Sequence, residues 1–178
     1  MRLFVAVYPP PELVRVWHEE LRVRDLPDHR VTPEDQVHLT LQFVGDVPRR
    51  EVDATKESVA RSVAGVRRFE LTVRRLISLP ERGPARLIAV ETDAPPPLLE
   101  IQVRLARRLA RKPRHRPSDR FLPHLTVCRF RGPVAVDTLD EELRPGAFPV
   151  QQVRLMNSVL NSQGAQHTTL AEYGLDER

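Results

Sequence analysis

The chain of 178 residues contains a single cysteine, Cys128, so it cannot form an internal disulfide or a cysteine-based zinc site. Glycine is scarce, with seven residues in all, and no glycine-rich loop that would cradle a nucleotide triphosphate is present. No apolar run approaches the length of a transmembrane helix, and the apolar start at residues 2–8 is too short for a signal peptide. These features are compatible with a reducing, cytoplasmic location.

Positive charge outweighs negative charge in the chain. The formal net charge is +4 and the sequence pI is about 9.9. Almost all of the positive charge is arginine, since the lysines are Lys56 and Lys112 alone. Such a balance favours an anionic partner without identifying it.

Hydrophobic periodicity predicts a mixed composition of strands and helices. Alternating or continuous apolar stretches predict strands at 2–8, 37–44, 69–78, 86–92, 123–130, 150–160 and 167–174. Helical spacing is found at 13–21, 52–66 and 98–109, and a short fourth helix is predicted at 136–143. The predicted fold class is therefore α+β.

One tetrapeptide is repeated almost unchanged. His38-Leu39-Thr40-Leu41 recurs as His124-Leu125-Thr126-Val127, and the proline runs at 9–11 and 95–97 have the same offset. Each proline run follows an apolar strand and precedes a helix, so the order strand, helix, His-containing strand occurs twice. The pattern predicts one domain over 1–178 with pseudo-repeats at about 1–80 and 81–178. It also predicts two pseudo-symmetric lobes around a central cleft, each a small, mostly antiparallel sheet with helices on its outer face.

The repeated motif carries groups suited to acid–base chemistry. Alternate residues of a strand share a face, so each His and Thr are expected to point into the cleft while the leucines pack under the helices. The expected cleft residues are His38, Thr40 and Gln42 from one strand and His124, Thr126 and Cys128 from the other. Two imidazoles can supply a general acid and a general base for displacement at phosphorus without a metal ion.

The chain resembles the 2H phosphoesterase superfamily, and within it the bacterial and archaeal RNA 2′,3′-cyclic phosphodiesterases, also described as 2′-5′ RNA ligases. The resemblance rests on the opening stretch at 2–7, on the first motif with its extension to Gly45, and on residues 123–129 around the second motif. The closing segment at 158–164 is also similar.

The resemblance implies metal-free and cofactor-free hydrolysis of an RNA 2′,3′-cyclic phosphate end to a 2′-phosphomonoester, with ATP-independent 2′-5′ ligation as a related activity. It implies that His38 donates a proton to the leaving oxygen and that His124 accepts one from water. It further implies that Thr40, Thr126 and Arg129 bind the phosphate. RNA is the implied partner, and a monomer away from membranes is expected.

One residue departs from strand alternation, and four others depart from the family pattern. Arg129 has the strand parity of Leu125, so a regular strand would direct it away from the cleft, and only a bulge after Thr126 would turn it inward. His167 stands where many relatives carry tyrosine, and other family aromatics are replaced at Gln36, Leu79 and Ile88. These replacements put the nucleobase preference, rather than the phosphate chemistry, in question.

A basic stretch from Arg104 to Arg120 precedes the second motif and is either a solvated helix face or a track for an RNA backbone. Two other functions are left open by the residues themselves. One is a non-catalytic RNA-binding module, and the other is an enzyme for small cyclic phosphates or 2′-5′ oligonucleotides.

Overall fold

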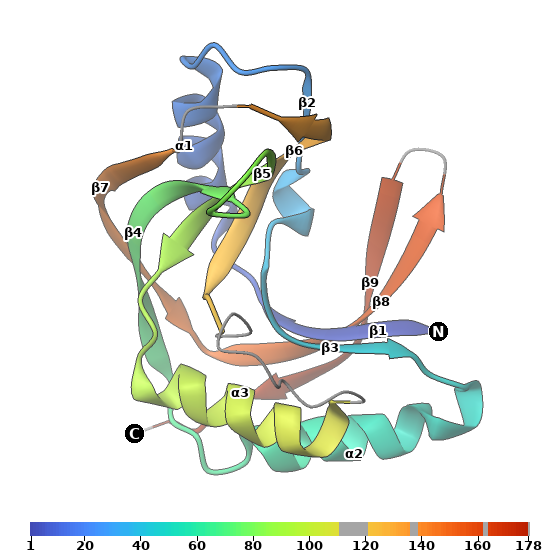
Figure 1. Ribbon diagram of the computed structural model, residues 1–178. Helices are drawn as coiled ribbons and strands as arrows, with labels where there is room; N and C mark the ends of the chain where they lie inside the picture. Colours follow the sequence, from blue (N-terminus) through green and yellow to red (C-terminus); the bar gives the residue numbers. More distant parts are fainter. Residues whose placement is uncertain (111–120, 136–138, 162–163, 178) are drawn as a thin grey trace.

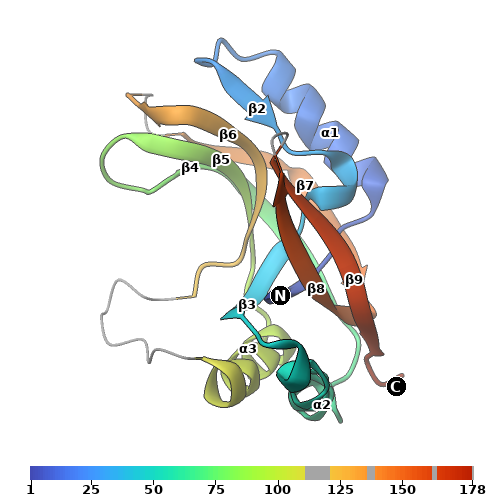
Figure 2. The same cartoon turned by 90° about the vertical axis from the view of Figure 1, so that its right-hand side faces the viewer.

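The computed structural model describes residues 1–110, 121–135, 139–161 and 164–177. Within these ranges a strongly curved antiparallel sheet lies between one helix and a pair of helices (Figures 1 and 2). The strands are β1 (Arg2–Val7), β2 (His29–Val31), β3 (Leu39–Asp46), β4 (Phe69–Leu79), β5 (Ala85–Thr92), β6 (His124–Val134), β7 (Asp140–Val150), β8 (Gln152–Asn161) and β9 (Gly164–Gly174). The α-helices are α1 (Pro11–Arg22), α2 (Val52–Val63) and α3 (Pro96–Leu109), and short 3₁₀ turns are formed by Glu34–Gln36 and Arg49–Glu51.

The sheet is built from two similar halves. Its strand order is β7-β4-β5-β6-β3-β1-β8-β9, with β2 added to β6. The halves meet where β3 pairs with β6, at Leu39 opposite Leu125. We call β3, β1, β8 and β9 the first half-sheet, and β6, β5, β4 and β7 the second. In each half-sheet the strand of the His motif, β3 or β6, lies at the junction. Its neighbour is the first strand of the same repeat, β1 or β5. This arrangement agrees with the predicted pseudo-symmetric α+β fold.

Proline runs start two of the helices. Pro11 opens α1 and Pro96 opens α3, positions where the fixed φ of proline suits a first helical turn and its missing N–H costs nothing. Each helix then buries one apolar stripe, which includes Trp17 and Leu21 in α1 and Ile101 and Leu105 in α3. The sequence pattern therefore located these helices correctly.

The helices pack across the junction. α1 connects β1 to β3 of the first half-sheet but contacts β6 of the second, whereas α3 connects β5 to β6 and contacts β3. α2 packs beside α3 and also contacts β8 and β9 (Figure 1). One apolar core, which contains both Leu39 and Leu125, runs through both half-sheets. The two halves are thus held together by helix packing as well as by the sheet.

Two regions differ from the sequence-based expectation. The predicted helix at 136–143 is wrong for residues 140–143, which form the start of β7, while 136–138 lie outside the described residues. The segment from Asp140 pairs with β4, and Asp140 forms an ion pair with Arg75 of that strand. The three-residue strand β2 was also not predicted, because so short a segment has no measurable periodicity.

In the described part of the chain, no helix is both long and apolar enough to cross a membrane.

Candidate active site

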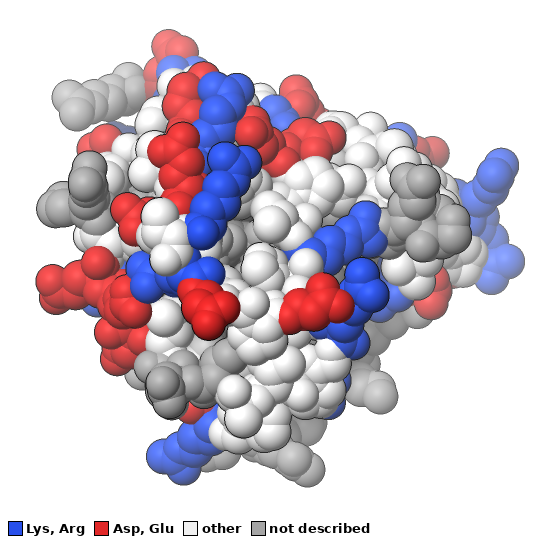
Figure 3. Space-filling view, turned by 90° about the horizontal axis from the view of Figure 1, so that it is seen from above, with Lys and Arg blue, Asp and Glu red and all other residues white. Residues whose placement is uncertain are grey.

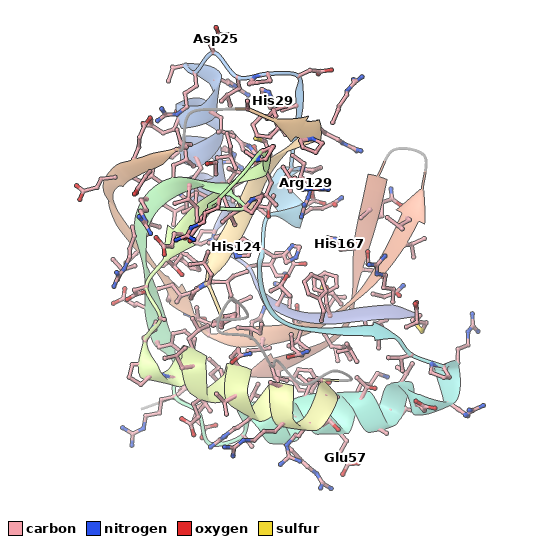
Figure 4. The ribbon with its side chains drawn as sticks, in the orientation of Figure 1. Asp25, His29, Glu57, His124, Arg129 and His167 are labelled. Atoms are coloured by element: carbon pink, nitrogen blue, oxygen red, sulfur yellow. The ribbon has the colours of Figure 1, made fainter. Side chains whose placement is uncertain are left out.

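A cavity of about 690 Å³ opens between the two half-sheets. Its walls come from β2, β3, β6, β9 and the loops that precede β3 and β6. Lining residues include both His-x-Thr motifs, which the fold therefore brings together, and also Arg129, Phe43, Arg30 and His167. Figure 4 shows His124 and Arg129 coming from β6 and His167 from β9.

The junction between the half-sheets sets the positions of the two motifs. Leu39 and Leu125 are buried and lie directly opposite each other in the antiparallel pair of β3 and β6. Continuing this register by one residue each way puts His38 opposite Thr126 and Thr40 opposite His124. Side chains directly opposite on one face have Cβ atoms ~4.5–5.5 Å apart. Four polar side chains therefore meet over a small area above the two leucines.

Both motif imidazoles are fixed in the same way. Nδ1 of His38 is 2.6 Å from the carbonyl oxygen of Gln36, and Nδ1 of His124 is 2.8 Å from that of Leu122. A carbonyl oxygen can only accept a hydrogen bond, so each Nδ1 carries the proton and donates it. Each neutral ring consequently presents the lone pair of Nε2 as its free proton acceptor.

The surroundings of the two imidazoles differ. The His38 ring packs against Phe4, Tyr8 and His167, with ring centroids 4.9, 5.5 and 5.1 Å away respectively. Burial lowers the pKa of His38 to about 4, with smaller contributions in the same direction from the positive charges of His167, Arg129 and His124. Burial, followed by the charge of Arg129, also lowers the pKa of His124. Both imidazoles are therefore mainly neutral at pH 7 in the free protein.

Each His strand contains a bulge at the same place in the repeat. In the pairing of β1 with β3, Val5 and Ala6 lie opposite Gln42 and Thr40, which leaves Leu41 as the extra residue. In the pairing of β5 with β6, Ile88 and Ala89 lie opposite Cys128 and Thr126, which leaves Val127 as the extra residue. A bulge shifts the alternation of side chains by one position. The residues that return to the cleft face are Phe43 and Arg129, which are themselves 86 positions apart.

The bulge in β6 explains why the Arg129 side chain faces the cleft and why the Cys128 side chain does not. Arg129 lines the cavity, although a regular strand would have directed it away. Cys128 does not share the His124 face as expected, because it follows the bulge and is fully buried in the apolar core. Burial raises the pKa of the Cys128 thiol to about 11, which makes it a poor nucleophile. In β3, Gln42 is also largely buried but still reaches the cavity wall, and its side chain donates to the carbonyl oxygen of Phe43 at 2.7 Å.

Three cleft residues were not identified as site residues from the sequence. Phe43 could have been found, because it has the same offset from Arg129 as the two motifs have from each other. His167 was noted only as a departure from the family, and it lies beside His38 with its Nδ1 buried and unpartnered among the described residues. Arg30 carries no sequence signal, since it reaches the cleft through the unpredicted strand β2.

The basic stretch is only partly described. Arg104 donates to the carbonyl oxygens of Ser62 at 3.4 Å and Ala64 at 2.8 Å, at the end of α2, and also forms an ion pair with Glu100. It therefore connects α3 to α2 rather than facing a ligand. Arg107 and Arg108 are exposed on α3. The remaining members, Arg111, Lys112, Arg114, Arg116 and Arg120, lie outside the described residues.

Among the described residues, no group of three or more His, Cys, Asp or Glu side chains is arranged to hold a metal ion.

Comparison with known proteins identifies relatives over most of the chain. Two curated proteins named RNA 2′,3′-cyclic phosphodiesterase are each 28% identical to it. The one from Methanothermobacter thermautotrophicus aligns over 82% of this chain and 81% of its own length, and the one from Thermus thermophilus over 98% and 90%. A crystal structure of a Thermus thermophilus protein superposes with a TM-score of 0.80 and 26% identity, covering 98% of both chains.

A family model provides the broadest assignment. The model described as the 2′-5′ RNA ligase superfamily matches residues 9–161, a span that contains both motifs, both bulges and Arg129. With its paired His strands joined at the centre of one curved sheet, this chain belongs to the 2′-5′ RNA ligase superfamily.

Proposed function

We propose that this protein is an RNA 2′,3′-cyclic phosphodiesterase that opens a terminal cyclic phosphate to a 2′-phosphomonoester. The observation that carries the proposal is the pair of His-x-Thr motifs, each with Nδ1 bound to a main-chain carbonyl, on the wall of one cavity. Relatives named for this activity support the choice of substrate.

In the proposed reaction, the oxygen of a water molecule attacks phosphorus and the bond from phosphorus to the 3′-oxygen breaks. Nε2 of His124 accepts the proton of the water, and Nε2 of His38 donates a proton to the leaving 3′-oxygen. One imidazole must therefore be protonated and the other neutral at the start. In the free protein, burial keeps His38 neutral at pH 7. The negative charge of a bound phosphate favours the protonated form, so we expect substrate to bind together with a proton.

The remaining site residues would bind the phosphate. The hydroxyls of Thr40 and Thr126 would donate to the non-bridging oxygens and keep phosphorus in line with the attacking water. Arg129 would add a charge-assisted contact that strengthens as charge develops on these oxygens. Phe43, with an exposed fraction of 68% on the cleft wall, offers a flat apolar surface to the nucleobase.

The same arrangement would support ligation without ATP. If a 5′-hydroxyl of RNA replaces water as the nucleophile, the same bond to the 3′-oxygen breaks and a 2′-5′ phosphodiester forms. The cyclic phosphate supplies the reactive bond, so no nucleotide cofactor is needed. We propose that the protein acts on RNA as a monomer in the cytoplasm, a compartment with which its single cysteine is in keeping.

The decisive experiment uses an RNA oligonucleotide that ends in a 2′,3′-cyclic phosphate. We expect conversion to a product that gains the mass of one water and becomes sensitive to phosphatase, with a phosphate that chromatography identifies as the 2′-isomer. Addition of EDTA should leave the rate unchanged, as expected for a site that uses no metal ion. A 3′-phosphate product, or no conversion at all, would overturn the proposal.

A further inference from the structure

Two arginines face the cleft from neighbouring strands. Arg30 of β2 lies directly opposite Arg129 of β6 in the antiparallel pairing. Directly opposite residues project from the same face of a sheet, and both residues line the cavity that contains the two motifs. The two guanidinium groups therefore belong to one wall of the cleft.

This pairing is unfavourable unless something compensates for it. Like charges directly opposite in an antiparallel pair destabilise the sheet. Among the described residues, neither Arg30 nor Arg129 forms an ion pair with a carboxylate, whereas Arg131, two residues further along β6, pairs with Asp28 at 3.2 Å. Arg131, which does not line the cavity, is therefore paired with a carboxylate. Arg30 and Arg129, which do line it, are not paired with any carboxylate that the structure describes.

The face of the molecule seen from above is not uniformly basic. Seen from above, Lys and Arg side chains are interspersed with Asp and Glu side chains (Figure 3). An anion bound between Arg30 and Arg129 would offset the repulsion of the two charges, because guanidinium groups match phosphate oxygens in geometry and charge.

The His-x-Thr centre already supplies four side chains to one phosphate, so the pair points to a second. We propose that Arg30 and Arg129 form an anion subsite for the internucleotide phosphate on the 5′ side of the terminal nucleoside. Arg129, with five N–H donors and a place on the same strand as His124, can contact both phosphates. Arg30 contacts the second phosphate alone. The subsite would make the enzyme prefer RNA ends over mononucleotides, and the inference rests on the proposed function.

The test compares two substrates of the wild-type protein and of Arg30→Gln. One substrate is a dinucleotide with a 2′,3′-cyclic phosphate end, and the other is the corresponding nucleoside 2′,3′-cyclic phosphate, which lacks the internucleotide phosphate. We expect the wild type to prefer the dinucleotide in kcat/KM, and Arg30→Gln to reduce this preference about tenfold, through KM. The dependence of log KM on log salt should also weaken by about 0.7 for the dinucleotide.

Arg131→Gln is the matched control, since it removes the same charge from β6, the strand paired with β2, at an arginine that already forms an ion pair with Asp28. It should leave the preference unchanged. An equal loss on both substrates in Arg30→Gln, no loss on either, or the same change in Arg131→Gln would overturn the subsite.

A binding measurement separates failure of the subsite from failure of the proposed function. Fluorescence anisotropy is measured with a dye-labelled dinucleotide that ends in a 2′-phosphate, and with a nucleoside 2′-phosphate as competitor. If the wild type hydrolyses neither cyclic substrate, the proposed function fails. The subsite then still stands if Arg30→Gln weakens dinucleotide binding about tenfold more than nucleoside binding, and falls if it does not.

Discussion

At the scale of single residues, the main-chain hydrogen bonds of His38 and His124 are the features most closely tied to chemistry. The same geometry is also found outside the cleft, where Nδ1 of His29 lies 2.8 Å from the carbonyl oxygen of Pro27. His29 does not line the cavity. It therefore provides an internal control for the structural effect of removing an imidazole held in this way.

We expect His38→Ala and His124→Ala each to lower kcat for cyclic phosphate hydrolysis by about 10²- to 10⁴-fold, because each removes a group that we propose to transfer a proton. His29→Ala should retain most of the activity. Circular dichroism and thermal unfolding would show whether the variants remain folded. Near-normal turnover by a folded His38→Ala variant would remove this residue from the mechanism.

The lowered imidazole pKa values predict a particular pH dependence. The profile of kcat/KM reports the free enzyme, in which burial lowers the pKa of His38 to about 4 and that of His124 below its usual value. We therefore expect a bell-shaped profile with its maximum on the acid side of pH 6.5. The profile of kcat reports the complex, where the bound phosphate favours imidazolium and should shift both limbs to higher pH. Coincident profiles would contradict proton uptake with the substrate.

Residue-level reasoning from the sequence was reliable where it depended on the repeat. The duplication and strand alternation alone placed His38, Thr40, His124 and Thr126 around one cleft, and the structure brings these four together. The roles assigned to them remain proposals. The same alternation failed for Cys128, because parity along a strand holds only while the pairing with its neighbour is regular.

At the scale of secondary structure elements, the two bulges explain that failure. A bulge is a property of two paired strands, so the sequence of one strand does not reveal it. β2 and β7 were missed for a related reason. Their conformation is fixed by pairing with β6 and β4 respectively, not by a hydrophobic pattern of their own. Long elements with a clear apolar stripe, such as α1 and α3, were predicted nearly to their ends.

The contact between α2 and α3 gives a prediction at this scale. Arg104→Ala removes hydrogen bonds to the carbonyl oxygens of Ser62 and Ala64 at the end of α2. We expect a loss of about 1 kcal/mol in the free energy of unfolding, since a partly exposed charged donor lies at the lower end of the range for such bonds. In a chain of this size the Tm should fall by about 2–4 °C.

Activity on RNA tests whether Arg104 stabilises the contact between α2 and α3 or instead binds the RNA backbone. Arg104→Ala should leave kcat/KM for an RNA cyclic phosphate unchanged, and Arg107→Ala, on the same helix but exposed, should change neither Tm nor kcat/KM strongly. A variant with unaltered Tm but weakened, salt-sensitive RNA turnover would show that Arg104 faces the nucleic acid instead.

At the scale of the whole molecule, the two sequence repeats and the two half-sheets do not coincide. β4 precedes residue 80 but lies in the second half-sheet, while β8 and β9 return from the end of the chain to complete the first. α1 and α3 also cross to the opposite half. The repeat indicated two lobes. It did not indicate which outer strands complete each lobe, because long-range packing decides this and local sequence patterns do not encode it.

This interlinked arrangement predicts that a ligand in the cleft stabilises the entire chain. A nucleoside 2′-phosphate at about 100 times its Kd should raise the free energy of unfolding by about 2.7 kcal/mol, visible as a higher Tm in one cooperative transition. Thr40→Val combined with Thr126→Val should reduce the rise, because the hydroxyls that would bind the phosphate are gone. Thr72→Val, on β4 and away from the cavity lining, is the control. A ligand-induced rise of the same size in the double variant would contradict phosphate binding by the threonines.

The paired bulges have one more consequence. A site with near-twofold symmetry offers the same contacts to a molecule entering in either of two opposed directions, and a directional polymer such as RNA would then dock both ways. Phe43 and Arg129 occupy equivalent places after the two bulges but present an aromatic ring on one side and a cation on the other. This inequality adds to the other differences between the two sides, which include Arg30 beside Arg129 and His167 beside His38. Exchanging the side chains at 43 and 129 should therefore weaken the preference for one polarity of the strand.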